Sequence, residues 1–161
     1  MKIAVIYHSE SGNTAEVAER IAQGARLNEG VQVQTMSIKD VDKEFVAEAN
    51  AVFLGTPTYG GNFSWQMKEW LDTGRVKLAD KLGAVFATEN FLGGGAGTAE
   101  MTLIGHLLVK GMVVYSSGTV KGQPFTHYGC VTIKAGDEAQ QERARIFGQR
   151  VAAKALELFG A

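Results

Sequence analysis

A cluster of hydrogen-bonding side chains follows the first apolar run of the sequence. The stretch HSESGNT, residues 8–14, places hydroxyl and amide groups around a glycine and contains no lysine or arginine. A helical pattern begins at its end, and the first turn of a helix leaves backbone N–H groups without an acceptor. These donors, with the positive end of the helix dipole, suit a phosphate. A cap formed by Asn13 or Thr14 is the simpler reading, but a cap needs only one such residue. Glu10 must turn its carboxylate away from such an anion, so we expect only its backbone to take part.

Two common nucleotide-binding fingerprints do not match this loop. A triphosphate loop reads G-x-x-x-x-G-K-[ST], and a dinucleotide fold carries G-x-G-x-x-G at this place. The glycine-rich run at residues 93–98, GGGAGT, does not supply the second pattern either, because a threonine stands at its third glycine position. The remaining candidate is a ligand that ends in a single phosphate group, held by neutral hydrogen-bond donors.

Two later loops carry groups that suit a flat ring. Residues 55–65, GTPTYGGNFSW, place Tyr59 in a tight turn, where it could form a wall against an aromatic ligand. Residues 88–98, TENFLGGGAGT, carry Asn90 and Phe91 in a loop whose backbone N–H groups could reach the polar edge of a ring. A surface tyrosine and a flexible, ligand-free loop are the plain alternatives. Only their combination with the first loop points to a cofactor.

Apolar runs alternate with helical patterns along the chain. The runs AVIY and AVFL show little alternation, which suits parallel strands covered on both faces, whereas the second run is more polar and suits an edge strand. The pattern predicts one doubly wound α/β domain over residues 1–161. In such sheets ligands bind beyond the carboxyl ends of strands, where the strand order reverses. We expect strands at residues 3–7, 31–38, 51–55, 83–88 and 111–115, and helices at 14–26, 41–49, 63–72, 97–109 and 137–159.

Helical spacing predicts which side chains each helix buries. Trp65 lies off the buried stripe of its helix, so we expect it to contact the ring site or a subunit interface. Cys130 is expected to be a small buried residue. The expected buried stripes are Ala18, Ile21, Ala22 and Ala25; Phe63, Met67, Trp70 and Leu71; Met101, Ile104 and Leu108; and Ala144, Phe147, Val151, Ala155 and Leu158.

Composition limits the classes of function. The net charge of −1 gives no electrostatic reason to expect nucleic acid as a partner. One cysteine excludes an internal disulfide, and three histidines without ligand spacing predict no metal site. The apolar run at residues 3–7 is too short for a signal peptide or a membrane span, so we expect a cytoplasmic protein without membrane insertion.

Taken together, the three loops resemble those of the flavodoxin-like superfamily. The run from Ser9 to Thr14 is similar to the loop that holds the phosphate of flavin mononucleotide (FMN). Within the superfamily the chain resembles most closely the NAD(P)H:quinone oxidoreductases first named as Trp-repressor-binding proteins. Two segments are shorter than in that family, and Val109 and Lys110 stand where it often has two histidines. The matching stretches are residues 55–62, 66–74, 84–95, 110–115, 127–133 and 144–152.

The resemblance implies a five-stranded parallel sheet, with strand order 2-1-3-4-5 and helices on both faces. It also implies an FMN site built from the three loops, one group for each part of the cofactor. Ser9, Glu10 (by its backbone), Ser11, Gly12, Asn13 and Thr14 hold the phosphate; Pro57, Thr58, Tyr59 and Gly60 line one side of the isoalloxazine; and Thr88, Glu89, Asn90, Phe91, Leu92, Gly93 and Gly94 follow its other edge and the ribityl chain.

The implied function is an FMN-dependent oxidoreductase that transfers electrons from NAD(P)H to a quinone-like acceptor. No catalytic side chain is expected, because the flavin performs the chemistry. Glu89 beside the ring is expected to lower the flavin potential. The alternative is a flavodoxin-type carrier between redox partner proteins, although such carriers tend to be more acidic than this chain. A scaffold with a vestigial, flavin-free pocket is the third reading. Because the family is typically tetrameric, a homo-oligomer, either a dimer or a tetramer, is also implied.

Overall fold

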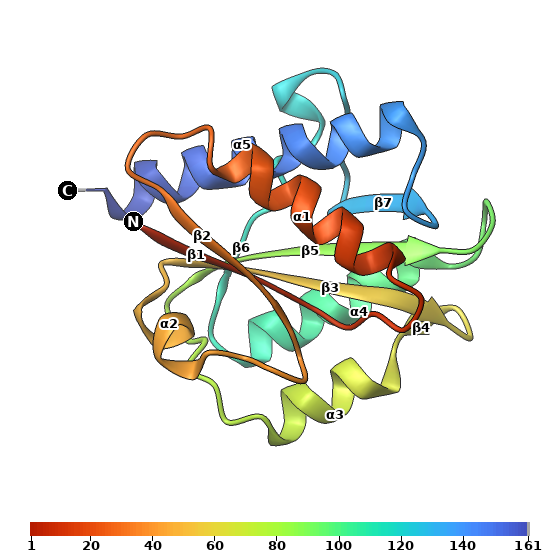
Figure 1. Cartoon of the computed structure of the whole chain (residues 1–161), viewed down its shortest axis with the longest axis horizontal. Helices are drawn as coiled ribbons and strands as arrows, with labels where there is room; N and C mark the ends of the chain where they lie inside the picture. Colours follow the sequence, from red (N-terminus) through yellow and green to blue (C-terminus); the bar gives the residue numbers. More distant parts are fainter. Residues whose placement is uncertain (161) are drawn as a thin grey trace.

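Seven strands form one sheet at the centre of the computed structural model, which describes residues 1–160 (Figure 1). Among these residues, no helix combines the length and apolar character required to cross a membrane. The elements in chain order are β1 (Lys2–Tyr7), α1 (Asn13–Ala25), β2 (Gln32–Ser37), α2 (Lys43–Glu48), β3 (Ala51–Tyr59), β4 (Asn62–Phe63), α3 (Trp65–Thr73), β5 (Leu82–Glu89), α4 (Ala96–Val109), β6 (Val113–Val114), a 3-10 turn (Thr119–Lys121), β7 (Cys130–Ile133) and α5 (Glu138–Phe159).

The main path of the sheet is β2-β1-β3-β5-β6, with every neighbouring pair parallel. This is the predicted order, and β2 lies at the edge as expected. Two strands are additional: β4 pairs antiparallel with β3, and β7 pairs parallel with the carboxyl half of β5. The predicted last strand, residues 111–115, is reduced to two residues, so β7 takes its place along the rest of β5.

The strand predicted at residues 51–55 continues to Tyr59. Its extension is stabilised on one side by β5, where Pro57 pairs with Thr88, and on the other by the short hairpin with β4. Gly60 and Gly61 form the two-residue turn of that hairpin, both with positive φ (57° and 75°). Such turns favour glycine, because other residues adopt these angles at a cost.

Helices cover both faces of the sheet, as predicted. Helices α1 and α5 pack on one face, where Phe53 of the sheet meets Phe147 edge-to-face with ring centroids 5.8 Å apart. Helices α2, α3 and α4 pack on the other face, where Leu54 is buried with Met67 and Leu103. Figure 1 shows these two layers above and below the sheet. Side chains of the central strands are buried alternately in the two cores, which explains their continuous apolar runs.

Glycines let α1 and α5 approach closely. A Cβ atom on Gly24 of α1 would lie 1.7 Å from the carbonyl oxygen of Arg145, and one on Gly148 of α5 would lie 2.0 Å from that of Ile21. No side chain fits at either place, because the backbone of one helix occupies the space beside the other. The two glycines therefore fix how α1 and α5 lie across the sheet.

Three of the predicted buried stripes are largely or fully confirmed. Every residue of the α1 stripe is buried, and so is the α5 stripe except Leu158, which is exposed near the end of its helix. In the predicted α3 stripe, Met67 and Leu71 are buried and Trp70 is half-buried, while Phe63 lies in β4 before the helix begins.

The stripe predicted for α4 is mostly wrong: of its three residues only Ile104 packs against the core, and its side chain is partly buried. Met101 and Leu108 are exposed (47% and 59%), and the helix instead buries Leu103 and Leu107. Apolar residues occupy several faces of this helix, so periodicity alone does not give its orientation. Contact with β5 selects the buried face.

Candidate functional site

A cavity lies at the carboxyl ends of β1, β3 and β5, where the sheet order reverses between β1 and β3. This is the position at which open α/β sheets bind ligands. The three loops identified in the sequence all contribute to its wall. Its lining residues are Glu10, Ser11, Asn13, Thr14, Pro57, Thr58, Tyr59, Thr88, Glu89, Asn90 and Lys134.

Ten of these eleven residues belong to the predicted cofactor site. The other predicted residues lie in the same loops but do not form the wall. The turn between β3 and β4 and the loop after β5 touch through glycines: a Cβ on Gly95 would lie 2.7 Å from Cα of Gly61. The predicted residues outside the wall are Ser9, Gly12, Gly60, Phe91, Leu92, Gly93 and Gly94.

The polar side chains of the first loop do not cap α1. The cap residue is Gly12, in the left-handed region with φ 89°, and it has no side chain to accept from the N–H groups of the first turn. Capping by Asn13 or Thr14, the simpler reading of the sequence, is therefore wrong. Ser9 Oγ instead accepts from the Gly12 N–H at 3.1 Å, which shapes the loop from within.

The start of α1 is consequently rich in free donors. The Glu16 N–H makes the first bond of the helix, to the Gly12 carbonyl at 3.0 Å, and within the described part of the chain the N–H groups of residues 13–15 find no acceptor. Thr14 Oγ1 lies 2.9 Å from Thr88 Oγ1 and joins this loop to the end of β5. An anion at this place would complete the hydrogen bonding of the helix start.

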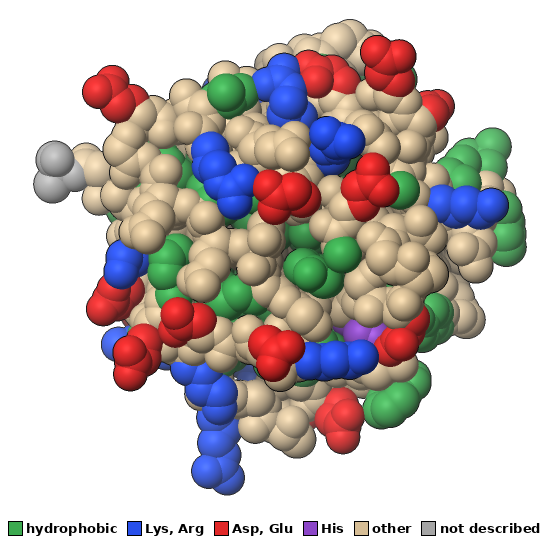
Figure 2. Space-filling model, viewed as in Figure 1, with side chains coloured by type: hydrophobic (Ala, Val, Ile, Leu, Met, Phe, Trp, Pro, Cys, Tyr) green, Lys and Arg blue, Asp and Glu red, His purple; other side chains and the backbone are tan. Residues whose placement is uncertain are grey.

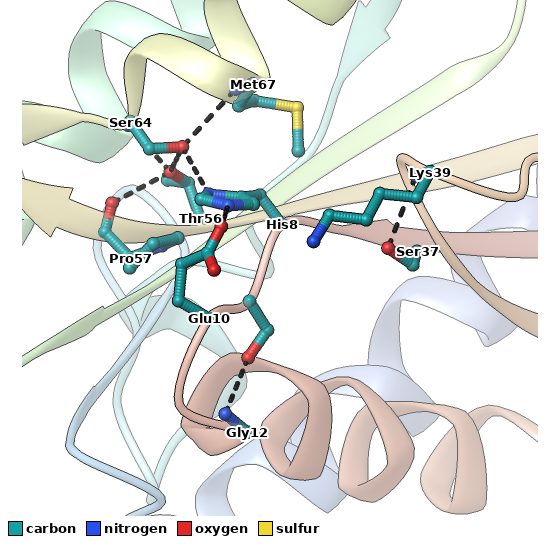
Figure 3. A network of polar contacts seen from close by, with 10 residues as sticks. His8, Glu10, Gly12, Ser37, Lys39, Thr56, Pro57, Ser64 and Met67 are labelled. Atoms are coloured by element: carbon teal, nitrogen blue, oxygen red, sulfur yellow. Dashed lines mark hydrogen bonds and ion pairs between the residues drawn. The ribbon is translucent and has the colours of Figure 1, made fainter.

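His8 directs the one carboxylate of the first loop. The imidazole is 1% exposed, and its Nε2 lies 2.8 Å from Oε1 of Glu10 (Figure 3). The carboxylate therefore lies on the His8 side, away from Gly12, as the sequence argument required. Hydrogen bonding to His8 and the charge of Lys39 hold the pKa of Glu10 below its usual value. His8 was not among the predicted site residues; its only signal is a polar side chain directly after a buried strand.

The same imidazole connects the first loop to the second. Nδ1 of His8 lies 2.9 Å from Ser64 Oγ, the cap of α3, and Thr56 Oγ1 accepts from the Ser64 N–H at 2.9 Å. The His8 ring also meets Tyr59 edge-to-face, with centroids 6.1 Å apart. Partial burial, and then the charge of Glu10, raise the pKa of the Tyr59 phenol. One buried network around His8 thus positions both the loop after β1 and the Tyr59 ring.

Glu89, at the end of β5, is hydrogen-bonded to the start of the next helix. Its Oε2 accepts from the Ala96 N–H at 3.0 Å, so its charge lies at the positive end of α4. Glu89 also lines the cavity that is expected to hold the ring. Its bond to α4 was not foreseen, and the helix dipole offsets part of its effect on a ligand.

Lys134 is the wall residue that sequence reasoning missed. It follows β7, where its N–H donates to the Glu89 carbonyl at 2.7 Å and its φ of 53° is positive. The side chain brings a cation to a site expected to have none. The run CVTI, residues 130–133, was the available signal, but its short length gave no strand prediction.

The residues present fit FMN. The free N–H groups of residues 13–15 suit its phosphate, and Tyr59 and Asn90 suit its ring. Thr58 Oγ1 adds an independent indication, because it is buried in the described structure without any hydrogen-bond partner and lines this cavity. A ligand with a polar ring edge would satisfy that hydroxyl.

Comparison with known proteins agrees with this geometry. The family model described as Flavodoxin matches residues 5–147. The chain is 44% identical over 160 residues to a flavodoxin of Clostridium saccharobutylicum, an alignment that covers 99% of this chain and 100% of that protein. It is 32% identical over 204 aligned positions to an NAD(P)H dehydrogenase (quinone) of Paraburkholderia phymatum, covering 99% of each.

A solved structure of similar fold comes from Agrobacterium tumefaciens and is described as a flavodoxin, WrbA-like protein. It superposes with a TM-score of 0.80 at 25% identity, covering 97% of this chain and 98% of that one. Both the carrier type and the quinone-reductase type of the sequence analysis are therefore represented among the similar proteins, with the flavodoxin at the higher identity.

Proposed function

Because the chain belongs to the flavodoxin family, we propose that it binds FMN and carries electrons between redox partner proteins. The observation that carries this proposal is the alignment with the clostridial flavodoxin, which at 44% identity spans that protein from end to end. The carrier, the alternative in the sequence analysis, is thus better supported than the quinone reductase. Bound FMN would supply the redox chemistry by accepting and releasing electrons. The tasks left to the protein are binding, orientation and control of access.

The start of α1 would hold the phosphate. The backbone N–H groups of residues 13–15 and the hydroxyl of Ser11 offer neutral donors, and the helix dipole adds a partial positive charge. His8 supports this by keeping the Glu10 carboxylate on its own side of the loop. A dianion can then approach without direct repulsion from the nearest acid.

The loops after β3 and β5 would hold the ring. Tyr59 is 40% exposed and rests on the buried His8, so its phenol ring is supported on the protein side and open on the other. Thr58 Oγ1 and the Asn90 amide offer polar contacts along the wall. Lys134 supplies the positive charge that would favour a flavin carrying extra electrons.

Exposed apolar side chains flank the site on both loops. Phe91 and Leu92 are exposed on the loop after β5, and Trp65 is exposed at the start of α3. Figure 2 shows hydrophobic side chains gathered at the right edge of the molecule, where Figure 1 places the loop after β5. A carrier needs such a surface beside its cofactor, because electron transfer requires a partner protein to dock there.

An NAD(P)H:quinone oxidoreductase is the second candidate, favoured by the 32% identity to the Paraburkholderia enzyme. That alignment needs 204 positions for a chain of 161 residues, so the enzyme contains segments without a counterpart here. The clostridial flavodoxin needs none of comparable size. The missing segments favour the carrier. NAD(P)H, a quinone-like acceptor and a homo-oligomer stay predictions that belong to this second candidate.

Anaerobic stopped-flow mixing with NADH and with NADPH separates the two functions. For a carrier we expect a yellow protein whose flavin absorbance does not fall within seconds of mixing with either nucleotide. After photoreduction, the same protein should pass electrons rapidly to oxidised cytochrome c, a protein acceptor. Rapid bleaching by NAD(P)H with turnover on benzoquinone would establish the enzyme instead. A colourless protein that refuses added FMN would refute both.

A further inference from the structure

A second cavity, of about 290 Å³, lies beside β7 with walls from α4 and α5. It shares no lining residue with the cavity described above. Its wall contains two charged side chains, Glu100 from α4 and Arg143 from α5, together with the aromatic side chains of Phe125 and Tyr128. Nothing in the proposed electron transfer uses these groups.

Glu100 is the central feature of this cavity. The residue is 2% exposed, and its Oε1 is buried without a hydrogen-bond partner in the described part of the chain. The backbone of Gly129 lies against it, since a Cβ there would be 2.6 Å from Glu100 Oε1. A buried polar atom left without a partner destabilises the folded state. An unpaired carboxyl oxygen on a residue that lines a cavity is therefore either a defect or part of a binding site.

The surroundings of Glu100 determine its charge. Burial raises the pKa of Glu100 to about 8; Arg143 opposes this rise and Glu89 adds to it. The Cys130 thiol on β7 stays neutral, because burial raises its pKa to about 12. His127 and Tyr128 are the remaining titratable groups on the wall. Near neutral pH the Glu100 carboxyl therefore keeps its proton and offers an O–H donor that has no acceptor.

Arg143 offers further donors to the same cavity. Its Nη2 donates to the Val131 carbonyl at 2.7 Å, and among the described residues no carboxylate lies within 4 Å of its guanidinium. Arg145, two residues along, differs in this respect: it pairs with Glu142, with Nη2 2.5 Å from Oε1. A guanidinium presents five N–H donors, and Arg143 uses some of them on the Val131 carbonyl and the Cys130 sulfur, so further donors remain for a ligand.

We propose that this cavity binds a small aromatic carboxylate, whose oxygens accept hydrogen bonds from the Glu100 carboxyl and the Arg143 guanidinium. A carboxylate matches the planar fork of arginine, and it supplies the acceptor that a protonated Glu100 lacks. Phe125 and Tyr128, both about half exposed, offer the apolar wall for a ring. A cationic ligand suits the cavity less, because it would lie beside the charge of Arg143.

Isothermal titration of the flavin-loaded full chain with sodium benzoate tests this site. We expect binding at pH 6.5 and about thirtyfold weaker binding at pH 9.5, because a carboxyl with a pKa of about 8 is then mostly ionised. Benzamide, which lacks the charge, should bind at least about tenfold more weakly than benzoate at pH 6.5. Flavin fluorescence should not change, since the two cavities share no residue.

Variants separate the two donors. Glu100→Gln keeps an N–H donor but cannot ionise, so benzoate should bind it equally at pH 6.5 and pH 9.5. Arg143→Gln should lose at least about tenfold in affinity. Arg145→Gln, on the same helix but already paired with Glu142, is the matched control and should bind like the parent protein. Circular dichroism checks that each variant is folded.

A measurement on the parent protein guards against variants that do not fold. A ¹³C NMR titration of the glutamate carboxyls should show benzoate raising the pKa of Glu100 above its ligand-free value. The proposal is overturned if Arg143→Gln folds and binds normally, if the pKa of Glu100 does not rise, or if benzoate displaces the flavin. It is also overturned if benzamidine, a cation of the same shape, binds more tightly than benzoate.

Discussion

Nε2 of His8 lies 2.8 Å from Oε1 of Glu10, and this contact keeps a carboxylate away from the helix start that is proposed to hold phosphate. The histidine is buried, so few other positions are open to its ring. Through Ser64 it also supports the start of α3. One side chain thus fixes both the electrostatics of the first loop and the place of the second.

Replacing His8 by leucine should weaken FMN binding by about tenfold or more, because a freed Glu10 carboxylate would repel the phosphate. The double change His8→Leu with Glu10→Gln should recover much of that loss, whereas Glu10→Gln alone should bind FMN as well as the parent. Quenching of flavin fluorescence on titration gives each affinity. If the double variant is as weak as His8→Leu, the contact matters only for structure.

The Tyr59 wall can be tested by removing its ring. Tyr59→Ala should lower FMN affinity by about tenfold, in keeping with roughly 0.5–1.5 kcal/mol for an aromatic contact, while Tyr59→Phe should bind almost normally. Tyr128→Ala provides the control, since Tyr128 is similarly exposed but belongs to the other cavity. Equal losses in Tyr59→Ala and Tyr128→Ala would contradict the assignment. The affinities come from equilibrium titration of the flavin-free protein.

Lys134 and Glu89 should shift the flavin midpoint potential in opposite directions. A cation favours the more negative, reduced flavin and a carboxylate disfavours it, so Lys134→Gln should lower the potential and Glu89→Gln should raise it. The Glu89 effect should be the smaller, because its carboxylate is held at the start of α4. Spectroelectrochemical titration measures both. An unchanged midpoint potential in Glu89→Gln would show that Glu89 does not influence the flavin.

The stability of the fold should fall with pH because of Glu100. Its folded pKa is raised to about 8, so between its ordinary value of 4.5 and that value the folded state binds more protons than the unfolded state. The free energy of unfolding should therefore decrease as pH rises through this range, by at most on the order of 1 kcal/mol per pH unit. Urea unfolding at pH 5, 6, 7 and 8 checks the slope. Glu100→Gln should show a flatter dependence, and an unchanged slope would argue against this origin.

The two close helices provide a stability test. Gly148→Ala should destabilise the protein by about 2–3 kcal/mol, because the new methyl group meets the backbone of α1. Gly105→Ala on α4 is the matched control: a Cβ there meets nothing within 4 Å, so the better helix former should stabilise by up to about 1 kcal/mol. Thermal unfolding of both variants gives the comparison. Destabilisation of similar size in both would show that crowding is not the cause.

The resemblance of its loops to those of the flavodoxin-like superfamily supplied the strand order and ten of the eleven residues around the first cavity, and the amino-acid pattern by itself determined the doubly wound arrangement of strands and helices. It could do so because strands buried on two faces are continuously apolar and the loops at their carboxyl ends carry local chemistry: Ser11, Asn13 and Thr14 are visible as donors wherever the chain goes. The buried face of α1 follows from periodicity in the same way, since its other face is polar.

Only the tertiary structure decided the rest. The orientation of α4 depends on contact with β5, because its own sequence is apolar on several faces and leaves Met101 exposed. Lys134 enters the site only because β7 pairs with β5. The sequence of a four-residue strand does not predict which distant strand it pairs with. Glu100 and Arg143 lie on different helices, are 43 residues apart in sequence, and share a cavity only after folding. Local patterns carry information about local structure, whereas a site assembled from distant segments exists only once the sheet has brought them together.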